Sequence, residues 1–472
     1  MGLGRATLAV CLALLVVPVP PAARPDRSRP RLPFAVALVV LGAFFGLSAP
    51  SAPAGAGPAP GGLDPTFGQG GKVVVKPPAE AGEWPGGQAV QPDGDVIVVG
   101  TAAPARYGYV FLLLRFLPDG RLDPTFGTGG RVWTDLVTLA TPLRGAVTGD
   151  VALGSSSATA VVVQPDGKIV VGGSTQSGGS SAFAVMRYLP DGRPDPSFGS
   201  DGLALTDFDA ATNDAITTLA LLPDGRILAA GAAGDAVGLA RYRPDGRLDT
   251  TFGEAKNGTV MTGRGLLNAL SLATEPGGRV LVAGQAGTAG GPFDFGVARY
   301  SPDGVLDPSF GDHGVVKSDL GSTGEWASGV AAGPGGTVVV GGSSGSSFAL
   351  LRYLADGTLD PAFGTGGVSR AGPDIGGAHA MVELPDGRPV LVGERVAGDW
   401  REVAVARYLP GGALDPGFGA GGVVGTDVTP GHDDGAAAAL YPGGRLVVVG
   451  TSLDAENVHP GVFLVRYSAV DG

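Results

Sequence analysis

The sequence predicts an all-β fold, a single seven-bladed β-propeller whose blades are four-stranded antiparallel sheets. A segment of the form Leu-Asp-Pro-x-Phe-Gly recurs seven times, in units that start near residues 63, 122, 194, 248, 306, 359 and 414. The 84 glycines and 39 prolines fall at fixed positions between valine-rich runs, which indicates tight turns rather than a low-complexity chain. Seven four-stranded units of this length are typical of a propeller, because the coils of a parallel β-helix are much shorter.

Each unit contains the same landmarks in a constant order. The Leu-Asp-Pro-x-Phe-Gly segment leads into a short β-like run, such as residues 130–133, and then into a loop of variable sequence. A hairpin follows, as in residues 160–173, in which Pro-Asp-Gly or Pro-Gly-Gly joins two apolar runs. Proline presets φ for such a turn, and glycine takes its left-handed position. After a second variable loop, a last strand ends in Arg-Tyr or Arg-Phe, which gives four antiparallel strands per unit.

One phenylalanine and one arginine recur in every unit. A side chain that every blade requires serves the blade itself, so we interpret both positions as structural. We expect the phenylalanine to anchor neighbouring blades and the arginine to pair with a nearby aspartate. If the arginine strand were innermost, seven guanidinium groups would instead line the channel and could bind an anion. The phenylalanines are Phe67, Phe126, Phe198, Phe252, Phe310, Phe363 and Phe418, and the arginines are Arg115, Arg187, Arg241, Arg299, Arg352, Arg407 and Arg466.

The paired motifs resemble the bacterial delta-60 repeat. The likeness rests on Leu-Asp-Pro-Thr-Phe-Gly, on Gln-Pro-Asp-Gly-Lys-Ile-Val-Val-Gly-Gly and on the Arg-Tyr strand end, and it extends over residues 62–472. It implies an exported, propeller-like repeat protein and assigns no reaction. The second unit departs from the pattern by a long insert between Asp135 and Ser157, and Asp249-Thr250 replaces Asp-Pro in the fourth unit.

Residues 1–56 have the features of a leader that is removed on export. The apolar segment 34–47 follows a cluster of arginines and precedes the small-residue cleavage signature of residues 54–56. This order is typical of a secretory signal peptide, and the segment is short for a membrane span. We therefore expect residues 57–472 to form the mature propeller, secreted or at the cell surface, with no membrane insertion after cleavage.

The first apolar stretch, residues 6–19, leaves two alternatives open. In the first, translation starts at Val19 on a non-standard start codon, which gives a signal peptide of ordinary length. Otherwise the two apolar stretches together form a membrane anchor.

Cysteine content and charge exclude several classes of function. The one cysteine, Cys11, lies in the leader, so the mature chain has no disulfide, thiolate metal site or cysteine nucleophile. The net charge is −12, and the five arginines and one aspartate of the leader leave the remainder at −16. Such a body repels a phosphate backbone, which argues against nucleic acid as a partner. We expect a monomer.

The alternation of turns and loops predicts two different faces. Regular turns gather on one face and variable loops on the other, so any specific site is expected among the variable loops. Their acids could bind calcium, but no stretch has the Asp-x-Asp-x-Asp-Gly spacing, and we predict solvated acids with no metal or other cofactor. These acids are Asp135, Asp207, Asp209, Asp214, Asp319, Glu325, Asp374, Asp427, Asp433 and Asp434.

Three tryptophans and one polar cluster in these loops are the candidate binding residues. Trp84 and Trp326 occupy matching positions in the first and fifth units, and Trp400 lies in the sixth. Exposed aromatic rings can stack on sugars or anchor a protein partner, although they could also wedge between blades. His432, Asp433 and Asp434 form the one histidine–carboxylate cluster, which we interpret as a polar loop rather than an acid–base pair.

These features favour an exported, non-enzymatic binding or scaffold propeller that engages an extracellular protein or glycan through the variable loops. No residue is assigned a catalytic role. The alternative is an extracellular hydrolase or lyase that acts on polysaccharide or another polymer. An enzyme needs acids and a base that converge near the central channel, whereas a binding module needs an exposed aromatic patch.

Overall fold

The computed structural model describes the chain from residue 59 to residue 470, and the predicted leader therefore lies outside the described residues. Within that range, the description omits residues 79–80, 105–107, 140–154, 178–179, 211, 289, 323, 373–374, 454–459 and 469. Among the described residues, no helix has the length and apolar character needed to cross a bilayer.

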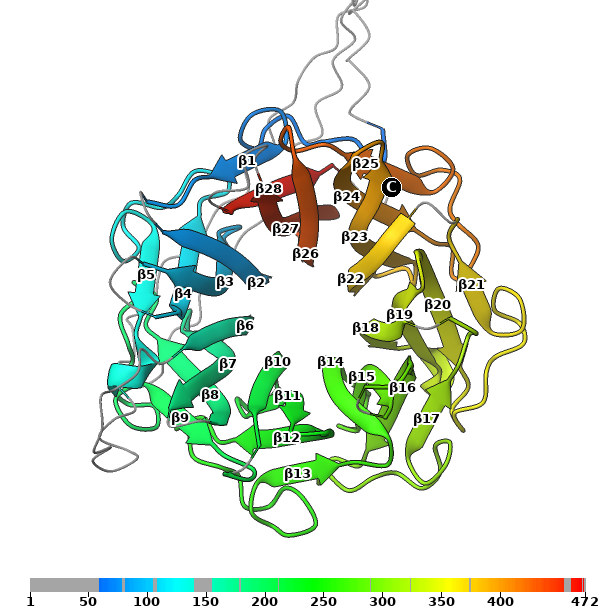
Figure 1. Ribbon diagram of the computed structural model, residues 1–472, viewed down its shortest axis with the longest axis horizontal. Coiled ribbons are helices and arrows are strands. Elements are labelled where there is room, and N and C mark those ends of the chain that lie inside the picture. Colours follow the sequence, from blue (N-terminus) through cyan, green and yellow to red (C-terminus); the bar gives the residue numbers. More distant parts are fainter. Residues whose placement is uncertain are drawn as a thin grey trace, which may run out of the picture. The chain divides into compact units, whose positions relative to one another are not determined.

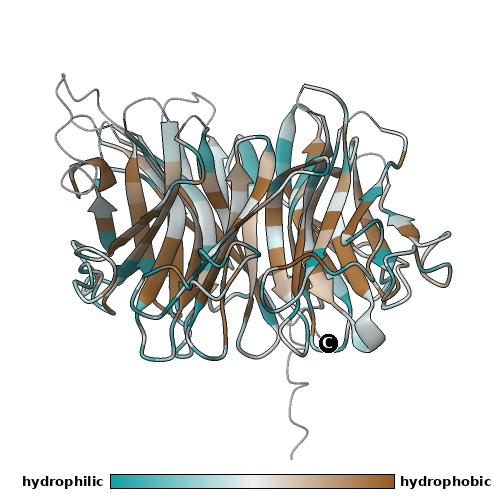
Figure 2. Ribbon diagram, turned by 90° about the horizontal axis from the view of Figure 1, so that it is seen from below, coloured by the Kyte–Doolittle hydropathy of each residue, from teal (hydrophilic) through white to brown (hydrophobic). Residues whose placement is uncertain are grey.

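Seven four-stranded antiparallel sheets surround a central axis (Figure 1), which confirms the predicted propeller. Blade 1 contains, from the centre outward, β2 (Gly82–Val90), β3 (Val96–Ala103), β4 (Val110–Phe116) and β5 (Arg131–Thr134). Hydrophobic residues concentrate in the strands and hydrophilic residues in the connections (Figure 2).

The other blades repeat this order. Blade 2 contains β6 (Ser156–Val163), β7 (Ile169–Ser177), β8 (Ser180–Tyr188) and β9 (Leu203–Thr206), and blade 3 contains β10 (Asp214–Leu221), β11 (Ile227–Ala233), β12 (Ala236–Tyr242) and β13 (Thr259–Thr262). Blade 4 contains β14 (Leu266–Thr274), β15 (Val280–Gly287), β16 (Phe293–Tyr300) and β17 (Val315–Ser318), and blade 5 contains β18 (Glu325–Ala332), β19 (Val338–Ser344), β20 (Ser347–Tyr353) and β21 (Val368–Arg370). Blade 6 contains β22 (Ile375–Glu383), β23 (Pro389–Ala397), β24 (Trp400–Arg407) and β25 (Val423–Thr426), and blade 7 contains β26 (His432–Tyr441), β27 (Arg445–Leu453), β28 (Gly461–Tyr467) and β1 (Lys72–Val75).

The ring closes through a sheet that both ends of the chain share. β1 pairs antiparallel with β28, from Lys72 opposite Val465 to Val75 opposite Val462. Each blade therefore takes three strands from one sequence unit and its outermost strand from the next unit. The blades are thus offset by one strand from the units that begin at Leu-Asp-Pro-x-Phe-Gly.

The recurring arginine lies on the third strand, so the guanidinium groups do not line the channel. In blade 3, Arg241 donates from Nε to Asp249 at 2.8 Å and lies 4.5 Å from the ring centre of Phe252. Its Nη1 donates to the carbonyl of Pro302, in a turn of blade 4, at 2.6 Å. All seven blades have the aspartate pair, the ring contact and the bond to the next blade.

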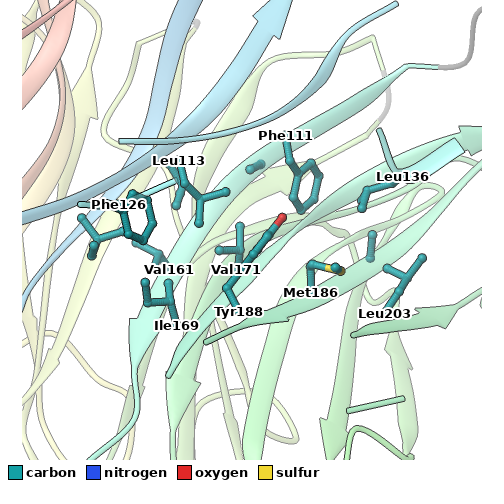
Figure 3. Packing of buried hydrophobic residues seen from close by; sticks show 14 residues of the cluster. Phe111, Leu113, Phe126, Leu136, Val161, Ile169, Val171, Met186, Tyr188 and Leu203 are labelled. Atoms are coloured by element: carbon teal, nitrogen blue, oxygen red, sulfur yellow. The ribbon is translucent and has the colours of Figure 1, made fainter. Parts of the chain in front are cut away.

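The hydrophobic core lies between neighbouring blades. Between blades 1 and 2, Phe111 of β4 packs in one cluster with Val171 of β7 and Tyr188 of β8 (Figure 3). Each innermost strand also has a register shift, and a glycine of the second strand lies opposite it. At Gly173, a Cβ atom would lie 1.9 Å from the carbonyl oxygen of Ser157, so the close approach of the two strands requires glycine.

Candidate functional site

The two faces of the ring differ as the sequence predicts. The hairpin between the first and second strands of each blade, and the Pro-Asp-Gly turn after the third, lie on one side, which we call the turn face. The loop between the second and third strands and the crossover to the next blade lie on the other side, which we call the variable face.

The candidate residues belong to strands rather than to loops, which corrects the prediction. Trp84 is in β2, Trp326 is in β18, Trp400 begins β24 and His432 begins β26. These strands extend beyond their valine- and alanine-rich centres because a β-ladder requires backbone pairing, which polar residues also provide. The candidates do not form one patch, since Trp84 belongs to blade 1, Trp326 to blade 5, and Trp400 and His432 to the junction of blades 6 and 7.

A groove on the variable face contains Trp84. We call it the Trp84–Tyr109 groove; it has a volume of about 690 Å³ and spans blades 1 to 3. The two rings meet edge to face with centroids 6.0 Å apart, and Tyr109 is 49% exposed. The lining residues are Trp84, Thr101, Tyr109, Ser155, Ser156, Ser157, Ser174, Gln176, Ser181 and Asn213.

Hydrogen bonds within and around this groove fix the positions of its polar groups. The hydroxyls of Thr101 and Ser157 lie 2.8 Å apart and join blade 1 to blade 2. Asn213 accepts from the backbone N–H of Ser181 at 3.1 Å, which joins blade 2 to blade 3. The backbone N–H of Ser156 donates to the carbonyl of Tyr109 at 2.8 Å. Residues of three blades therefore form the groove, and these hydrogen bonds hold them in place.

A second set of polar residues, which we call the channel-mouth cluster, lies at blades 6 and 7. It comprises His379, Glu394, Arg401, His432 and Asp434. His379 Nε2 and Glu394 Oε2 are 2.5 Å apart, and Arg401 Nη1 lies 3.7 Å from Glu394 Oε1 and 4.0 Å from Asp434 Oδ1. The backbone N–H of Arg401 donates to His432 Nδ1 at 3.2 Å, and this bond joins the two blades.

The charges of this cluster shift its carboxyl groups in opposite directions. Burial acts to raise the pKa of Glu394, but the hydrogen bond and charge of His379 and the charge of Arg401 hold that pKa below its usual range. Glu394 is therefore ionised at neutral pH and accepts, so the ring of His379 donates from Nε2. Burial and repulsion from Glu394 raise the pKa of Asp434, although Arg401 opposes this shift.

Several predicted residues lie near this cluster. The rings of Trp400 and His432 meet edge to face with centroids 5.3 Å apart, and Trp400 is 47% exposed. Trp326 donates from Nε1 to the carbonyl of Ala378 at 3.3 Å, which brings it beside His379. Both Trp326 and His379 line a channel cavity of about 410 Å³, formed by the innermost strands of all seven blades.

Sequence reasoning missed Tyr109, His379, Glu394 and Arg401. His379 and Glu394 lie on adjacent strands, β22 and β23, whose register shifts bring them together, and spacing along the chain does not indicate this. Tyr109 had a usable signal, because it is an aromatic residue in a variable loop of the same unit as Trp84.

Asp433, predicted as a binding residue, has a structural role. It is fully buried and accepts from the backbone N–H groups of Val428 and Thr429 at 2.7 and 2.9 Å, in the crossover from β25. Asp214 and Glu325 cap the crossovers of blades 3 and 5 in the same way. Burial raises the pKa of Asp214 and of Asp433.

Some of the acids that could bind calcium thus accept hydrogen bonds from other groups of the protein. Asp294, Asp319 and Glu325 offer oxygen atoms within 4.8 Å of one another. However, Glu325 already accepts from Leu320 at 2.8 Å and from the Ser322 and Ser344 hydroxyls at 2.9 and 3.0 Å. Asp374 lies outside the described residues.

Another cavity, of about 730 Å³, lies between blades 2 and 3 at the outer side of the ring. Its lining includes Gly199, Gly246 and Leu248, which belong to the motifs that recur in every unit. A cavity formed by recurring positions does not distinguish one blade from another, so it is a weaker candidate than the Trp84–Tyr109 groove.

A family model described as "Domain of unknown function (DUF5122) beta-propeller" matches six segments of the chain, residues 91–126, 164–198, 222–252, 276–310, 334–363 and 384–418. Each match runs from a hairpin turn to the recurring phenylalanine. A seventh copy would begin near Tyr441 and end at Phe67, so ring closure divides it between the two ends of the chain. The matches agree with a repeat β-propeller family and do not confirm the delta-60 name.

No curated protein matches the chain. Among solved structures, Sqt1 from Chaetomium thermophilum is similar at 11% identity, with 82% of this chain and 96% of that chain covered and a TM-score of 0.45. YCF48 bound to D1 peptide is similar at 10% identity, with 86% and 99% covered and a TM-score of 0.43. The PQQ-bound aldose sugar dehydrogenase of Streptomyces coelicolor is similar at 15% identity, with 84% and 98% covered and a TM-score of 0.37. These likenesses carry no functional argument.

Proposed function

We propose that this chain is an exported, non-enzymatic binding or scaffold propeller that engages an extracellular protein or glycan through its variable face. The observation that supports this function is the Trp84–Tyr109 groove. It combines the half-buried ring of Trp84 and the exposed ring of Tyr109 with a concave polar lining. Its volume of about 690 Å³ also lies within the range of ordinary ligand sites.

The test is to measure binding of the full chain to arrays of glycans and of purified surface proteins. Trp84→Ala and Trp400→Ala alter the variable face, and Leu409→Ala removes an apolar side chain that is 37% exposed on the turn face as the matched control. We expect at least one ligand whose binding is weakened by a variable-face variant and unchanged by Leu409→Ala. Binding that only Leu409→Ala weakens would contradict the proposal.

One observation favours the alternative of an extracellular hydrolase or lyase. His379 lines the channel cavity and holds Glu394 at 2.5 Å, so a base and an acid do converge near the channel. With Nε2 bonded to Glu394, a neutral His379 keeps Nδ1 as a proton acceptor. This candidate predicts new reducing ends or unsaturated sugar ends when polysaccharides are incubated with the chain, and their loss in Glu394→Gln. The absence of both products leaves the binding function as the better one.

A further inference from the structure

The Trp84–Tyr109 groove presents an aromatic surface beside uncharged polar groups. A pyranose ring carries C–H groups on its faces and hydroxyls around its rim, so it needs an apolar platform and hydrogen-bonding partners at once. Trp84 and Tyr109 supply aromatic faces, whose negative potential attracts C–H groups. The remaining lining residues are serine, threonine, glutamine and asparagine.

The groove has unused hydrogen-bonding capacity for such a ligand. In the described part of the chain, the side chains of Ser155, Ser174 and Gln176 have no hydrogen-bond partner. Asn213 uses its carbonyl oxygen for Ser181, which leaves its amide N–H groups as donors. A hydroxyl or an amide both donates and accepts across its atoms, which matches the hydroxyls of a sugar.

The lining also argues against a charged ligand. None of the ten lining residues is charged, so the carboxylate of a uronic acid or a sulfate group would have no lining cation beside it. Placing an unpaired charge in a concave site is unfavourable. The carboxylate of nearby Asp214 is directed to the N–H of Phe208 and the hydroxyl of Thr212, at 2.9 and 3.0 Å, so it is engaged within its own crossover.

We propose that the Trp84–Tyr109 groove binds an uncharged sugar residue of a neutral glycan. This inference rests on the proposed binding function and names the class of ligand for it. Trp84 is the stacking platform, Tyr109 forms the adjoining wall, and Ser174, Gln176 and Asn213 contact the hydroxyls.

The experiment is a calorimetric and fluorescence titration of the full chain with soluble neutral polysaccharides (glucans, mannan and galactan) and with alginate and heparin as charged counterparts. We expect binding of at least one neutral polysaccharide, weakened about tenfold or more by Trp84→Ala and by Tyr109→Ala, as for truncation of an aromatic binding residue. Trp84→Phe keeps a ring, so it should retain binding and lose the fluorescence change. Leu409→Ala, which removes an exposed apolar side chain on the turn face, should leave binding unchanged.

The outcomes separate this inference from the function on which it rests. If only a charged glycan or a protein binds, and variable-face variants weaken that binding, the inference is wrong and the binding function stands. Neutral binding that neither Trp84→Ala nor Tyr109→Ala weakens also overturns the inference. If neither a glycan nor a protein binds, both proposals fail. Tyr109 is about half exposed and Gln176 is exposed, so Tyr109→Ala and Gln176→Ala keep the test valid even if Trp84→Ala does not fold.

Discussion

At the scale of single residues, one arrangement of aspartate, arginine and phenylalanine recurs in every blade. The arginine is held by the aspartate of its own blade, covers the phenylalanine ring and donates to a carbonyl of the next blade. One side chain therefore links the end of a blade to its neighbour. This explains why the arginine and the phenylalanine motif recur together in every unit, although successive copies lie 53 to 72 residues apart.

Arg241→Met should lower the free energy of unfolding by about 3 kcal/mol, because it removes the buried cation that shares Asp249 with Arg226 and breaks the hydrogen bond to Pro302 of the next blade. The side chains of Arg241 and Asp249 are only 5% and 6% exposed. Chemical denaturation measures the change. Arg247→Met in the same blade is the control, since Arg247 is 81% exposed and should change stability by less than about 0.5 kcal/mol. Equal effects of the two variants would contradict the role of Arg241.

The seven aspartates of this arrangement should make the propeller sensitive to acid. Burial acts to raise their pKa, but hydrogen bonds and the arginine charge hold the pKa below its usual range. A lowered folded-state pKa means that their stabilisation is complete above the ordinary value of about 4 and is lost as pH falls through the folded-state value. The thermal midpoint should therefore fall between neutral pH and pH 2. A midpoint that rises over this range would be inconsistent with these ion pairs.

At the scale of elements, the crossovers of the variable face are held by buried acids. Asp214, Glu325 and Asp433 each begin or nearly begin an innermost strand and accept from backbone N–H groups of the preceding crossover. A carboxylate in this position fixes the loop that leads into the blade. Part of the acidity of this face is therefore structural, which the sequence alone did not separate from metal binding.

We expect calcium to leave the stability of the full chain unchanged. Glu325, the buried member of the Asp294, Asp319 and Glu325 group, already uses both oxygens for hydrogen bonds. A calcium ion that binds the folded chain and is present at a concentration of 100 times its Kd would add about 2.7 kcal/mol to the free energy of unfolding. Thermal unfolding in excess calcium and in chelator checks this, and a clear rise in midpoint with calcium would show a real metal site.

β1 is the element on which ring closure depends. Removing residues 1–75 deletes β1, Phe67 and Asp64, the partner of Arg466. We expect this variant to lose at least about 3 kcal/mol of stability, since a buried arginine is left without its carboxylate. Removing residues 1–58 is the control and should preserve the midpoint of denaturation. If the two truncations unfold alike, closure through β1 does not stabilise the ring.

The sequence predicted the blades well because the same local pattern of turns and strands recurs seven times along the chain. It did not predict closure, since β1 and β28 lie at opposite ends of the chain and each strand looks like any other. Trp84 was predicted as a binding residue, but Ser174, Gln176 and Asn213 reach the same groove from two other blades. Only the three-dimensional order of the blades brings such residues together.

At the scale of the whole molecule, the motifs that recur in every blade and the residues that differ between blades lie on different sides of the ring. The turn face and the outer side carry recurring motifs, whereas the variable face carries the Trp84–Tyr109 groove and the channel-mouth cluster. The net charge of −12 also repels anionic polymers at long range. A neutral glycan would meet neither this repulsion nor an unpaired charge in the groove.

The most direct measurement is hydrogen–deuterium exchange of the full chain with and without the soluble neutral polysaccharides. We predict slower exchange in the described segments that form the groove, residues 81–84, 108–110, 155–157 and 174–176, and no change in the turn-face hairpins. Protection confined to those hairpins, or no protection at any polysaccharide concentration, would contradict a binding propeller that uses its variable face for neutral glycans.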